Sequence, residues 1–187
     1  IGGRSASSNE AVIKKHCGPN DLVFHTDAPG SPFVVLKEGQ EAEDEDKKDA
    51  ARLAGVYSKA WKHGVGEVEV LEVHPDQVTK EAQSGEYINK GSFMIYGERK
   101  EHRVGIELGL GLRRMEDDIL LMGGPANVVR KHCPVYVILG QGKKSKGDIS
   151  KHIMKILRIA RNDSILPRLP SGTFRIKEKD IESIKKL

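Results

Sequence analysis

The segment HTDAPGSP, residues 25–32, concentrates side chains that could do chemistry just before an apolar run. His25 and Asp27 are two residues apart, so on an extended backbone they share a face. The pair could supply a general base with its orienting carboxylate, or two metal ligands. The same residues suit a tight turn in which Asp27 accepts hydrogen bonds from backbone amides while Pro29 and Gly30 fix the reversal. We expect the turn, because neither a G-x-S-x-G nor an H-E-x-x-H motif accompanies the pair.

The two cysteines, Cys17 and Cys133, each follow a histidine. These pairs lack the C-x₂₋₄-C and H-x₃₋₅-H spacing of structural zinc sites. We therefore expect no metal and no other cofactor, and we expect each His-Cys pair to end a short helix before a strand. Two cysteines do not make a disulfide framework, which favours a reducing cytoplasm. No apolar stretch approaches the roughly 20 residues of a bilayer span, so we expect no membrane partner.

The segment GQGKKSKGDIS resembles a phosphate-binding loop, but Asp148 stands where the G-x-x-x-x-G-K-[ST] motif needs lysine. What remains is a strand, a flexible loop with Lys143, Lys144 and Lys146, and a helix beginning near Asp148. Four cations recur along this helix at spacings that place them opposite its isoleucines: Lys151, Lys155, Arg158 and Arg161. Such a face suits contact with a polyanion, and a solvated helix surface is the alternative.

Basic and aromatic residues are interleaved in residues 74–100. This pattern suits phosphate contact combined with base stacking, although about half of the aromatic side chains must face the core. Charge along the chain is also segregated, within a formal net charge of +4. Residues 38–49 carry seven acids and two lysines, a net of −5, whereas residues 141–187 carry 13 Lys and Arg against 5 Asp and Glu, a net of +8. The basic part favours a nucleic-acid partner.

The elements that hold these residues follow from local patterns. Ser7 and Glu10 form a capping-box pattern for a helix that Gly18-Pro19 ends. The runs DLVFH and FVVLK predict a hairpin around residues 26–32. An acidic loop, residues 38–49, precedes a helix that ends at Gly64.

The rest of the chain contains both predicted strands and predicted helices. Strands are expected in EVEVLEV, SFMIYG, RVGIELGL, DILLMG and PVYVILG. Helices are expected in GPANVVRKH, DISKHIMKILRIAR and EKDIESIKKL. Because there is no strict βαβ alternation, we predict an α+β fold with a mixed, largely antiparallel sheet, flanking helices and a single domain over residues 1–187.

Five segments, in chain order, resemble one known family: IGGRSASSNE, DLVFHTDAPGSP, AGVYSKAW, QVTKEAQSGEYINKGSFMIYGERK and YVILGQGKKSKGDISKHI. They are similar to the NFACT-R domain, the RNA-binding domain of the NFACT proteins, a group that includes Rqc2-like and fibronectin-binding proteins. SGEYINKGSFMIYG is the most specific part. The H-x-D-x-x-G turn of the family matches His25, Asp27 and Gly30, and Pro29 stands where a second histidine is common.

The resemblance implies a cytoplasmic, non-catalytic module that binds tRNA or rRNA, with the large ribosomal subunit as a candidate partner in ribosome-associated quality control. In the family this domain accompanies an NFACT-N domain and a coiled coil, which we expect in cis or in trans. The start at IGGR suggests a processed chain or a domain of a longer protein. The alternatives are a protein-interaction module using the acidic run 41–46, and a His/Asp-based enzyme.

From the residue patterns and the resemblance together we predict one set of RNA contacts, in which HTDAPGSP is a rigid turn at the RNA-facing edge. The set is His25, Asp27, Lys80, Tyr87, Lys90, Arg99, Lys100, Lys143, Lys144, Lys146, Lys151, Lys155 and Arg158.

Overall fold

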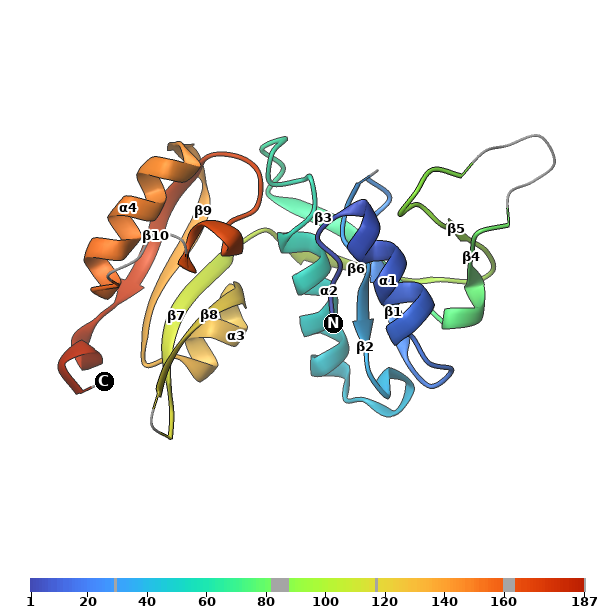
Figure 1. Cartoon of the computed structure of the whole chain (residues 1–187), viewed down its shortest axis with the longest axis horizontal. Coiled ribbons are helices and arrows are strands. Elements are labelled where there is room, and N and C mark those ends of the chain that lie inside the picture. Colours follow the sequence, from blue (N-terminus) through green and yellow to red (C-terminus); the bar gives the residue numbers. More distant parts are fainter. Residues whose placement is uncertain (29, 82–87, 117, 160–163, 187) are drawn as a thin grey trace. The chain divides into compact units, whose positions relative to one another are not determined.

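The computed structural model describes residues 1–28, 30–81, 88–116, 118–159 and 164–186. Helices and strands are intermixed, and the described strands pair antiparallel in three sheets (Figure 1), which confirms the α+β prediction. Contacts divide the chain into unit 1, residues 1–60 with 67–105, and unit 2, residues 61–66 with 106–187. The single domain over residues 1–187 stays a prediction, and each unit is described by itself.

Unit 1 is built on a four-stranded sheet in the order β2-β1-β3-β6. Its strands are β1 (Leu22–His25), β2 (Val34–Leu36), β3 (Glu67–Val73) and β6 (Lys100–Gly105). Strands β1 and β2 form the predicted hairpin. Successive side chains of a strand point to opposite faces, so Leu22 and Phe24 enter one core cluster and Val23 enters another.

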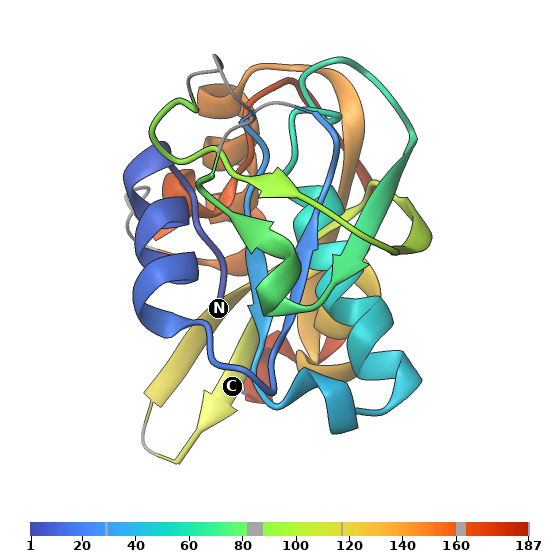
Figure 2. The same ribbon diagram turned by 90° about the vertical axis from the view of Figure 1, so that its right-hand side faces the viewer.

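Two helices cover the two faces of this sheet (Figures 1 and 2). Helix α1 (Ala6–His16) adds Val12 to the cluster of Val23, and α2 (Asp44–Val56) adds three alanines to the cluster of Phe24. The predicted acidic loop is wrong in part, because residues 44–49 form the first turns of α2. A short helix η1 (Gly39–Glu41) precedes them. Acidic residues suit a helix start because the helix dipole is positive there.

A two-stranded ribbon completes unit 1. It pairs β4 (Val78–Thr79) with β5 (Met94–Ile95), after the short helix η2 (Pro75–Gln77). Three of its apolar side chains pack against the α1 side of the sheet: Val78, Phe93 and Ile95. The ribbon therefore shares the core that α1 covers.

Unit 2 is built on a second four-stranded sheet, in the order β10-β9-β7-β8. Its strands are β7 (Leu108–Met115), β8 (Asp118–Pro125), β9 (Val135–Lys144) and β10 (Phe174–Asp180). Its helices are α3 (Ala126–His132), α4 (Lys146–Leu157), η4 (Leu166–Arg168) and η5 (Glu182–Lys186). The buried Trp61 lies with its ring centroid 5.4 Å from that of Phe174 and donates Nε1 to the Thr173 carbonyl at 3.2 Å.

Four details of the sequence-based elements are corrected. Helix α1 is capped by Ser5 with Ser8, not by Ser7 with Glu10. Helix α2 ends at Val56 instead of Gly64, and RVGIELGL is divided between β6 and β7. The terminal helix expected in EKDIESIKKL is largely wrong, because residues 174–180 form β10, which alternates Phe174 and Ile176 with exposed cations. The expected His-Cys pattern is confirmed: α1 and α3 end at His16 and His132, with a strand following each cysteine.

Two glycines of β7 let α3 approach the sheet closely. A Cβ atom on Gly109 would lie 2.5 Å from Cβ of Val129, and one on Gly111 would lie 2.5 Å from Cβ of Cys133. Both distances are shorter than carbon atoms tolerate, so side chains at these positions would push α3 away. Gly124, which pairs with Gly109 across β7 and β8, has open space instead.

We predict that Gly109→Ala destabilises the protein by about 1–3 kcal/mol, because the added methyl overpacks the contact between β7 and α3. Gly124→Ala is the matched control and should change the free energy of unfolding by less than about 0.5 kcal/mol. Urea denaturation followed by circular dichroism measures both. Equal stability of the two variants would contradict the packing described for α3.

Candidate nucleic-acid interface

A buried amide on α1 holds the segment that follows β1. Asn9 donates Nδ2 to the Ser31 carbonyl at 3.0 Å, and its Oδ1 accepts from the Phe33 amide at 3.1 Å. Thr26 donates its hydroxyl to Ser31 Oγ at 2.6 Å, and the Ser31 amide donates to the Ala28 carbonyl at 3.2 Å. Residues 26–28 and 30–33 therefore form a hydrogen-bonded turn, which Asn9 of α1 holds from one side.

His25 is built into this turn. Its ring stacks on Phe33 with centroids 3.9 Å apart and planes 3° from parallel, and its Nδ1 lies 2.9 Å from the Pro32 carbonyl. Burial lowers the pKa of His25, and the Pro32 carbonyl and the Asp27 charge only partly offset that effect. A stacked, half-buried and neutral imidazole stabilises a turn and is a poor source of phosphate contact.

Asp27 does not have the capping role predicted for it. It is exposed, and among the described residues no hydrogen bond reaches its carboxylate. The buried Asp21 caps amides instead, accepting from Gly18 at 2.7 Å and Glu38 at 3.0 Å, and it pairs with Lys37 at 2.5 Å. Burial disfavours the charge on Asp21, but the two amides and the Lys37 ammonium together hold its pKa below the usual value.

Lys59 is a residue of this surface that sequence reasoning missed. Gly30 has φ +78°, and a Cβ atom there would lie 2.8 Å from both Cε and Nζ of Lys59. The exposed Lys59 side chain therefore lies against Gly30. No sequence signal linked the two residues, because they are far apart in the chain and belong to different elements.

Lys80, predicted to contact RNA, is engaged inside unit 1. Its Nζ lies 3.2 Å from Glu10 Oε2, donates to the Asn89 carbonyl at 3.0 Å and sits 4.8 Å from the centre of the Phe93 ring. Glu10 also accepts from the Gly91 amide at 3.0 Å. The pair thus ties the segment around residues 89–93 to α1.

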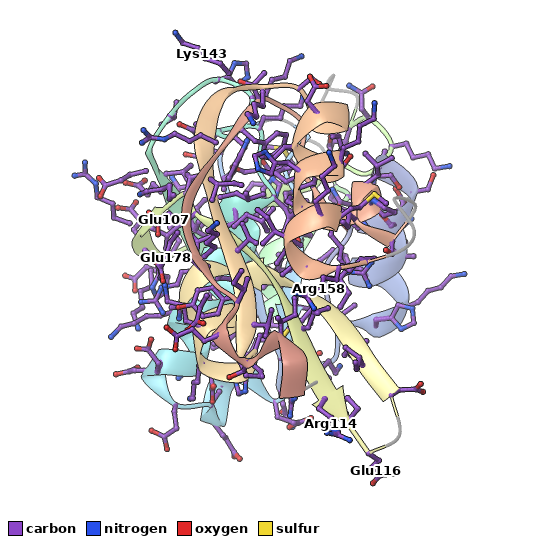
Figure 3. The ribbon with its side chains drawn as sticks, turned by 90° about the vertical axis from the view of Figure 1, so that its left-hand side faces the viewer. Glu107, Arg114, Glu116, Lys143, Arg158 and Glu178 are labelled. Carbon is purple, nitrogen blue, oxygen red and sulfur yellow. The ribbon has the colours of Figure 1, made fainter. Side chains whose placement is uncertain are left out.

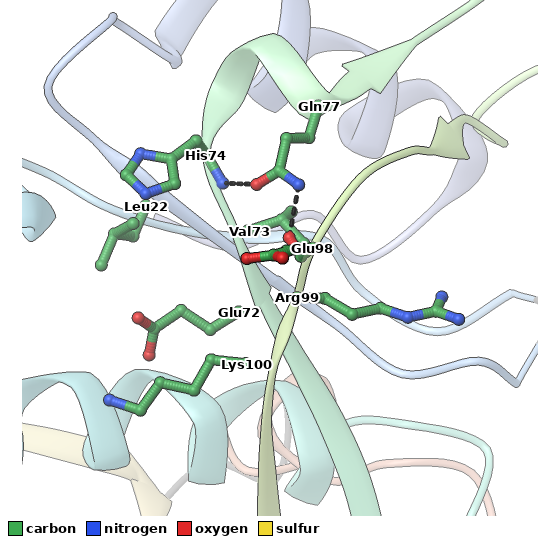
Figure 4. A pocket seen from close by; sticks show the side chains of 8 residues that line it. All are labelled: Leu22, Glu72, Val73, His74, Gln77, Glu98, Arg99 and Lys100. Carbon is green, nitrogen blue, oxygen red and sulfur yellow. Dashed lines mark hydrogen bonds between the residues drawn. The ribbon is translucent and has the colours of Figure 1, made fainter.

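The other described residues of unit 1 that we predicted to contact RNA do not form one cluster. Tyr87 lies outside the described residues, and Lys90 is exposed. Arg99 and Lys100 are exposed and line a pocket at the end of β3, and Figure 4 shows their side chains pointing to opposite sides of β6. Unit 1 therefore presents cations at several places, and Lys80 is used within the fold.

The flexible lysine loop predicted after β9 is a strand end. Lys143 and Lys144 are the last residues of β9, and Ser145 alone separates them from α4. Lys143 and Lys144 are both exposed, and Lys144 Nζ lies 2.9 Å from Nδ1 of the His152 ring. Lys146 begins α4, is half-buried and interacts within the protein.

Helix α4 presents the predicted basic face. Ile149, Ile153 and Leu157 are fully buried, and Lys151 and Lys155, one turn apart, are exposed on the other side. The helix is shorter than predicted, because Arg158 takes a left-handed conformation with φ 54° and ends it, and Arg161 lies outside the described residues. Figure 3 shows Arg158 at one end of α4 and Lys143 beyond the other. Cations therefore extend along the whole length of α4.

Neither cysteine is bonded to another residue through a disulfide among the described residues. Cys17 and Cys133 are free thiols, and Cys133 is buried with Sγ 3.8 Å from the sulfur of Met122. Within the described part of the chain, no three His, Cys, Asp or Glu residues are grouped as metal ligands. No helix among the described residues has the length and apolar character that crossing a bilayer requires.

An α+β frame with cations along an exposed helix face has the character of a nucleic-acid-binding domain. Residues 1–97 match the family described as NFACT protein RNA binding domain, and the chain belongs to this family. The match lies mostly in unit 1 and ends before β7. Helix α4 is therefore outside the matched part.

Curated relatives extend over more of the chain. The archaeal Rqc2 homolog aRqcH of Methanocaldococcus jannaschii is 36% identical over 183 residues, covering 96% of this chain and 27% of that protein. The ribosome quality control complex subunit NEMF of Homo sapiens is 36% identical over 101 residues, covering 53% of this chain and 9% of that protein. The chain is thus homologous to Rqc2 and NEMF ribosome quality control factors, and it spans about a quarter or less of their length.

One solved structure is also similar to the chain. It is the C-terminal part of the fibronectin/fibrinogen-binding protein from Streptococcus suis, at 25% identity and a TM-score of 0.48. The similarity covers 57% of this chain and 40% of that chain.

We predict that Asn9→Ala destabilises the protein by about 1–3 kcal/mol, because it leaves the buried Ser31 carbonyl and Phe33 amide without their partner. Asp27→Ala is the control in the same turn and should stay within about 0.5 kcal/mol, since its carboxylate is exposed. Thermal denaturation at pH 7 compares the two. A larger loss for Asp27→Ala than for Asn9→Ala would overturn the account of the clamp.

Glu10 generates a prediction about pH. Hydrogen bonds from Lys14, then from the Gly91 amide and Lys80, lower the pKa of Glu10 from 4.5 to about 2. A carboxylate with a depressed pKa stabilises the folded state fully above its unfolded pKa, and this contribution is lost as the pH falls through the folded pKa. The stability difference between wild type and Glu10→Gln should therefore be largest above pH 5 and shrink towards pH 2. Urea titrations across that range measure it, and a constant difference would contradict the assignment.

Proposed function

We propose that this chain is a non-catalytic RNA-binding module for tRNA or rRNA, and that the exposed face of α4 contacts the phosphate backbone. The observation that carries the proposal is the placement of Lys151 and Lys155 on α4 opposite its buried isoleucines, with Lys143 and Arg158 beyond its two ends. Lysine and arginine side chains that neutralise phosphates supply most of the sequence-independent affinity for nucleic acids.

Acidic groups near this face do not cancel its charge. Asp148, in the first turn of α4, accepts from the Ser145 hydroxyl at 2.6 Å, and Ser145 in turn caps the helix by accepting from the Asp148 amide at 3.1 Å. This carboxylate sits at the positive end of the helix dipole, which it partly neutralises. Lys151 and Lys155 follow it towards the other end of the helix, and the face around them is cationic.

The cellular role proposed here follows the relatives. The chain is homologous to factors named for ribosome quality control, so we place it in the cytoplasm at the large ribosomal subunit, with NFACT-N and coiled-coil parts supplied in cis or in trans. Because the chain spans about a quarter of the archaeal relative, docking on the ribosome is a property we propose for the longer assembly.

The alternative functions have less support. Part of the acidic segment, residues 38–49, is already paired within the protein. Arg52 Nη1 lies 2.7 Å from Glu45 Oε1 and 2.6 Å from Asp49 Oδ1. A protein that binds the rest of this run would use Glu41, Glu43 and Asp44, which are exposed. For an enzyme, His25 would need an imidazole free to reach a substrate, and its ring is stacked against Phe33.

We predict that Lys151→Ala combined with Lys155→Ala weakens tRNA binding and flattens its salt dependence. Each phosphate contact contributes about −0.7 to −0.9 to the slope of log affinity against log salt. Four contacts give a slope near −3, and removing two should bring it to about −1.5. Fluorescence anisotropy with labelled tRNA at several potassium chloride concentrations measures the slope.

The matched control removes the same charge elsewhere. Lys47→Ala combined with Lys48→Ala takes two cations from α2, directly after the acidic run 41–46, and should leave the slope unchanged. If the α4 double variant keeps the wild-type affinity and slope, RNA does not contact this face. If both double variants lose affinity equally, only net charge matters, and the proposed placement of the RNA is wrong.

A further inference from the structure

Unit 1 contains a pocket of about 480 Å³ at the end of β3, and four polar side chains border it on one side. Figure 4 shows Glu72, His74, Glu98 and Lys100 around the same space, while Arg99 extends away on the other side of β6. The backbone here is held firmly. Gln77 donates Nε2 to the carbonyls of Tyr96 and Glu98 at 2.7 and 2.5 Å and accepts from the His74 amide at 2.8 Å.

Some polar side chains of the pocket already have partners among the described residues, and others do not. Glu72 lies opposite Lys100 across β3 and β6, and its Oε2 is 2.5 Å from Nε2 of His102. The side chains of Glu98 and Lys100 make no hydrogen bond or ion pair with other described residues, and both are exposed. The pocket therefore offers one carboxylate and one ammonium group that are available to a ligand.

The charges in the pocket disfavour a phosphate as its occupant. Arg99 also lines the pocket, but its side chain extends to the other side of β6. On the opposite side two carboxylates, on Glu72 and Glu98, face one ammonium group, on Lys100, so the charge on that side is negative. An anion would be repelled at close range, where like charges cost most. A neutral ligand suits the pocket better if it has two adjacent N–H groups and a carbonyl oxygen. The N–H groups can donate to the carboxylate, and the carbonyl oxygen can accept from the ammonium group.

A guanine base has this combination of groups. Its N1–H and N2–H donors lie side by side and fit one carboxylate, and its O6 and N7 atoms accept from lysine or arginine. Adenine places its N1 acceptor where guanine has a donor, and uracil offers a single N–H between two carbonyls. A carboxylate therefore binds guanine by two hydrogen bonds and opposes adenine.

We propose that this pocket binds an unstacked guanine base of single-stranded RNA. Glu98 accepts from the base N1–H and N2–H groups, Lys100 donates to O6, and the exposed His74 ring offers a surface for stacking. Arg99, on the other side of β6, is placed for the backbone of the same strand. The proposal rests on the proposed function, since it assigns a base-reading site to an RNA-binding chain. His74 lies within the part of unit 1 that the family match covers, residues 1–97, and Glu98 and Lys100 lie just after it.

The test compares fluorescein-labelled RNA pentamers that differ at the central base, UUGUU, UUAUU and UUIUU with inosine. Wild-type protein should bind the guanine pentamer about tenfold more tightly than the adenine pentamer, in line with one bidentate base contact. Inosine, which keeps N1–H and O6 but lacks the N2 amine, should fall between them. Anisotropy titrations at low salt give the three dissociation constants.

Glu98→Gln should reduce the preference for guanine to about twofold or less, with little change for the adenine pentamer, because the amide keeps the shape and loses the second acceptor. Lys100→Ala should weaken the guanine and inosine pentamers, which share O6. The control is Glu101→Gln, which removes the same charge from an exposed residue of β6. Glu101 follows Lys100 directly, so its side chain faces the opposite side of the strand. This variant should keep the wild-type preference.

Several results would overturn the proposal. Equal affinity of wild-type protein for the guanine and adenine pentamers would do so, as would a preference that survives Glu98→Gln. Titration with tRNA in the same buffer separates this failure from failure of the proposed function. If tRNA binds with the expected salt slope and the pentamers show no guanine preference, only the pocket assignment is wrong; if neither tRNA nor pentamers bind, both are wrong.

Discussion

Helix α4 can bury only one of its faces, and the distribution of charge in unit 2 depends on that constraint. Ile149, Ile153 and Leu157 recur at helical spacing and are fully buried, which leaves Lys151 and Lys155 to solvent. The exposed lysines cost little, because a charged side chain in water loses none of its hydration. The packing of α4 and the exposure of its lysines thus follow from one periodic pattern.

In unit 1, helix α1 has another role, because its side chains fix loops. Asn9 and Glu10 are neighbours on α1, yet Asn9 holds the turn after β1 and Glu10 holds the segment around Gly91. Short polar contacts of this kind order backbone that has no regular structure of its own. The pocket bordered by Glu98 and Lys100 is ordered similarly, by the amide of Gln77. Polar side chains therefore order the loops of unit 1, whereas unit 2 places exposed cations along a helix.

The spacing of residues along the chain was enough to predict those features that are set by neighbours in sequence. The hairpin of β1 and β2, the His-Cys helix ends and the buried face of α4 follow from spacing alone. Contacts between distant residues could not be predicted in this way, so three of them were missed: the capping by Asp21, the position of Lys59 beside Gly30, and the pairing of Lys80 with Glu10. The strand β10 was missed because its charged residues also suit a helix, and pairing with β9 decides between the two.

Lysine footprinting tests the central claim, that RNA contacts the exposed face of α4, most directly. The chain is acetylated with and without saturating tRNA, and modification of each lysine is read by mass spectrometry. The account predicts that tRNA protects Lys151, Lys155 and Lys143, while Lys47 and Lys48 on α2 react at the same rate in both samples. Unchanged modification of Lys151 and Lys155 in a sample where tRNA is bound would contradict it.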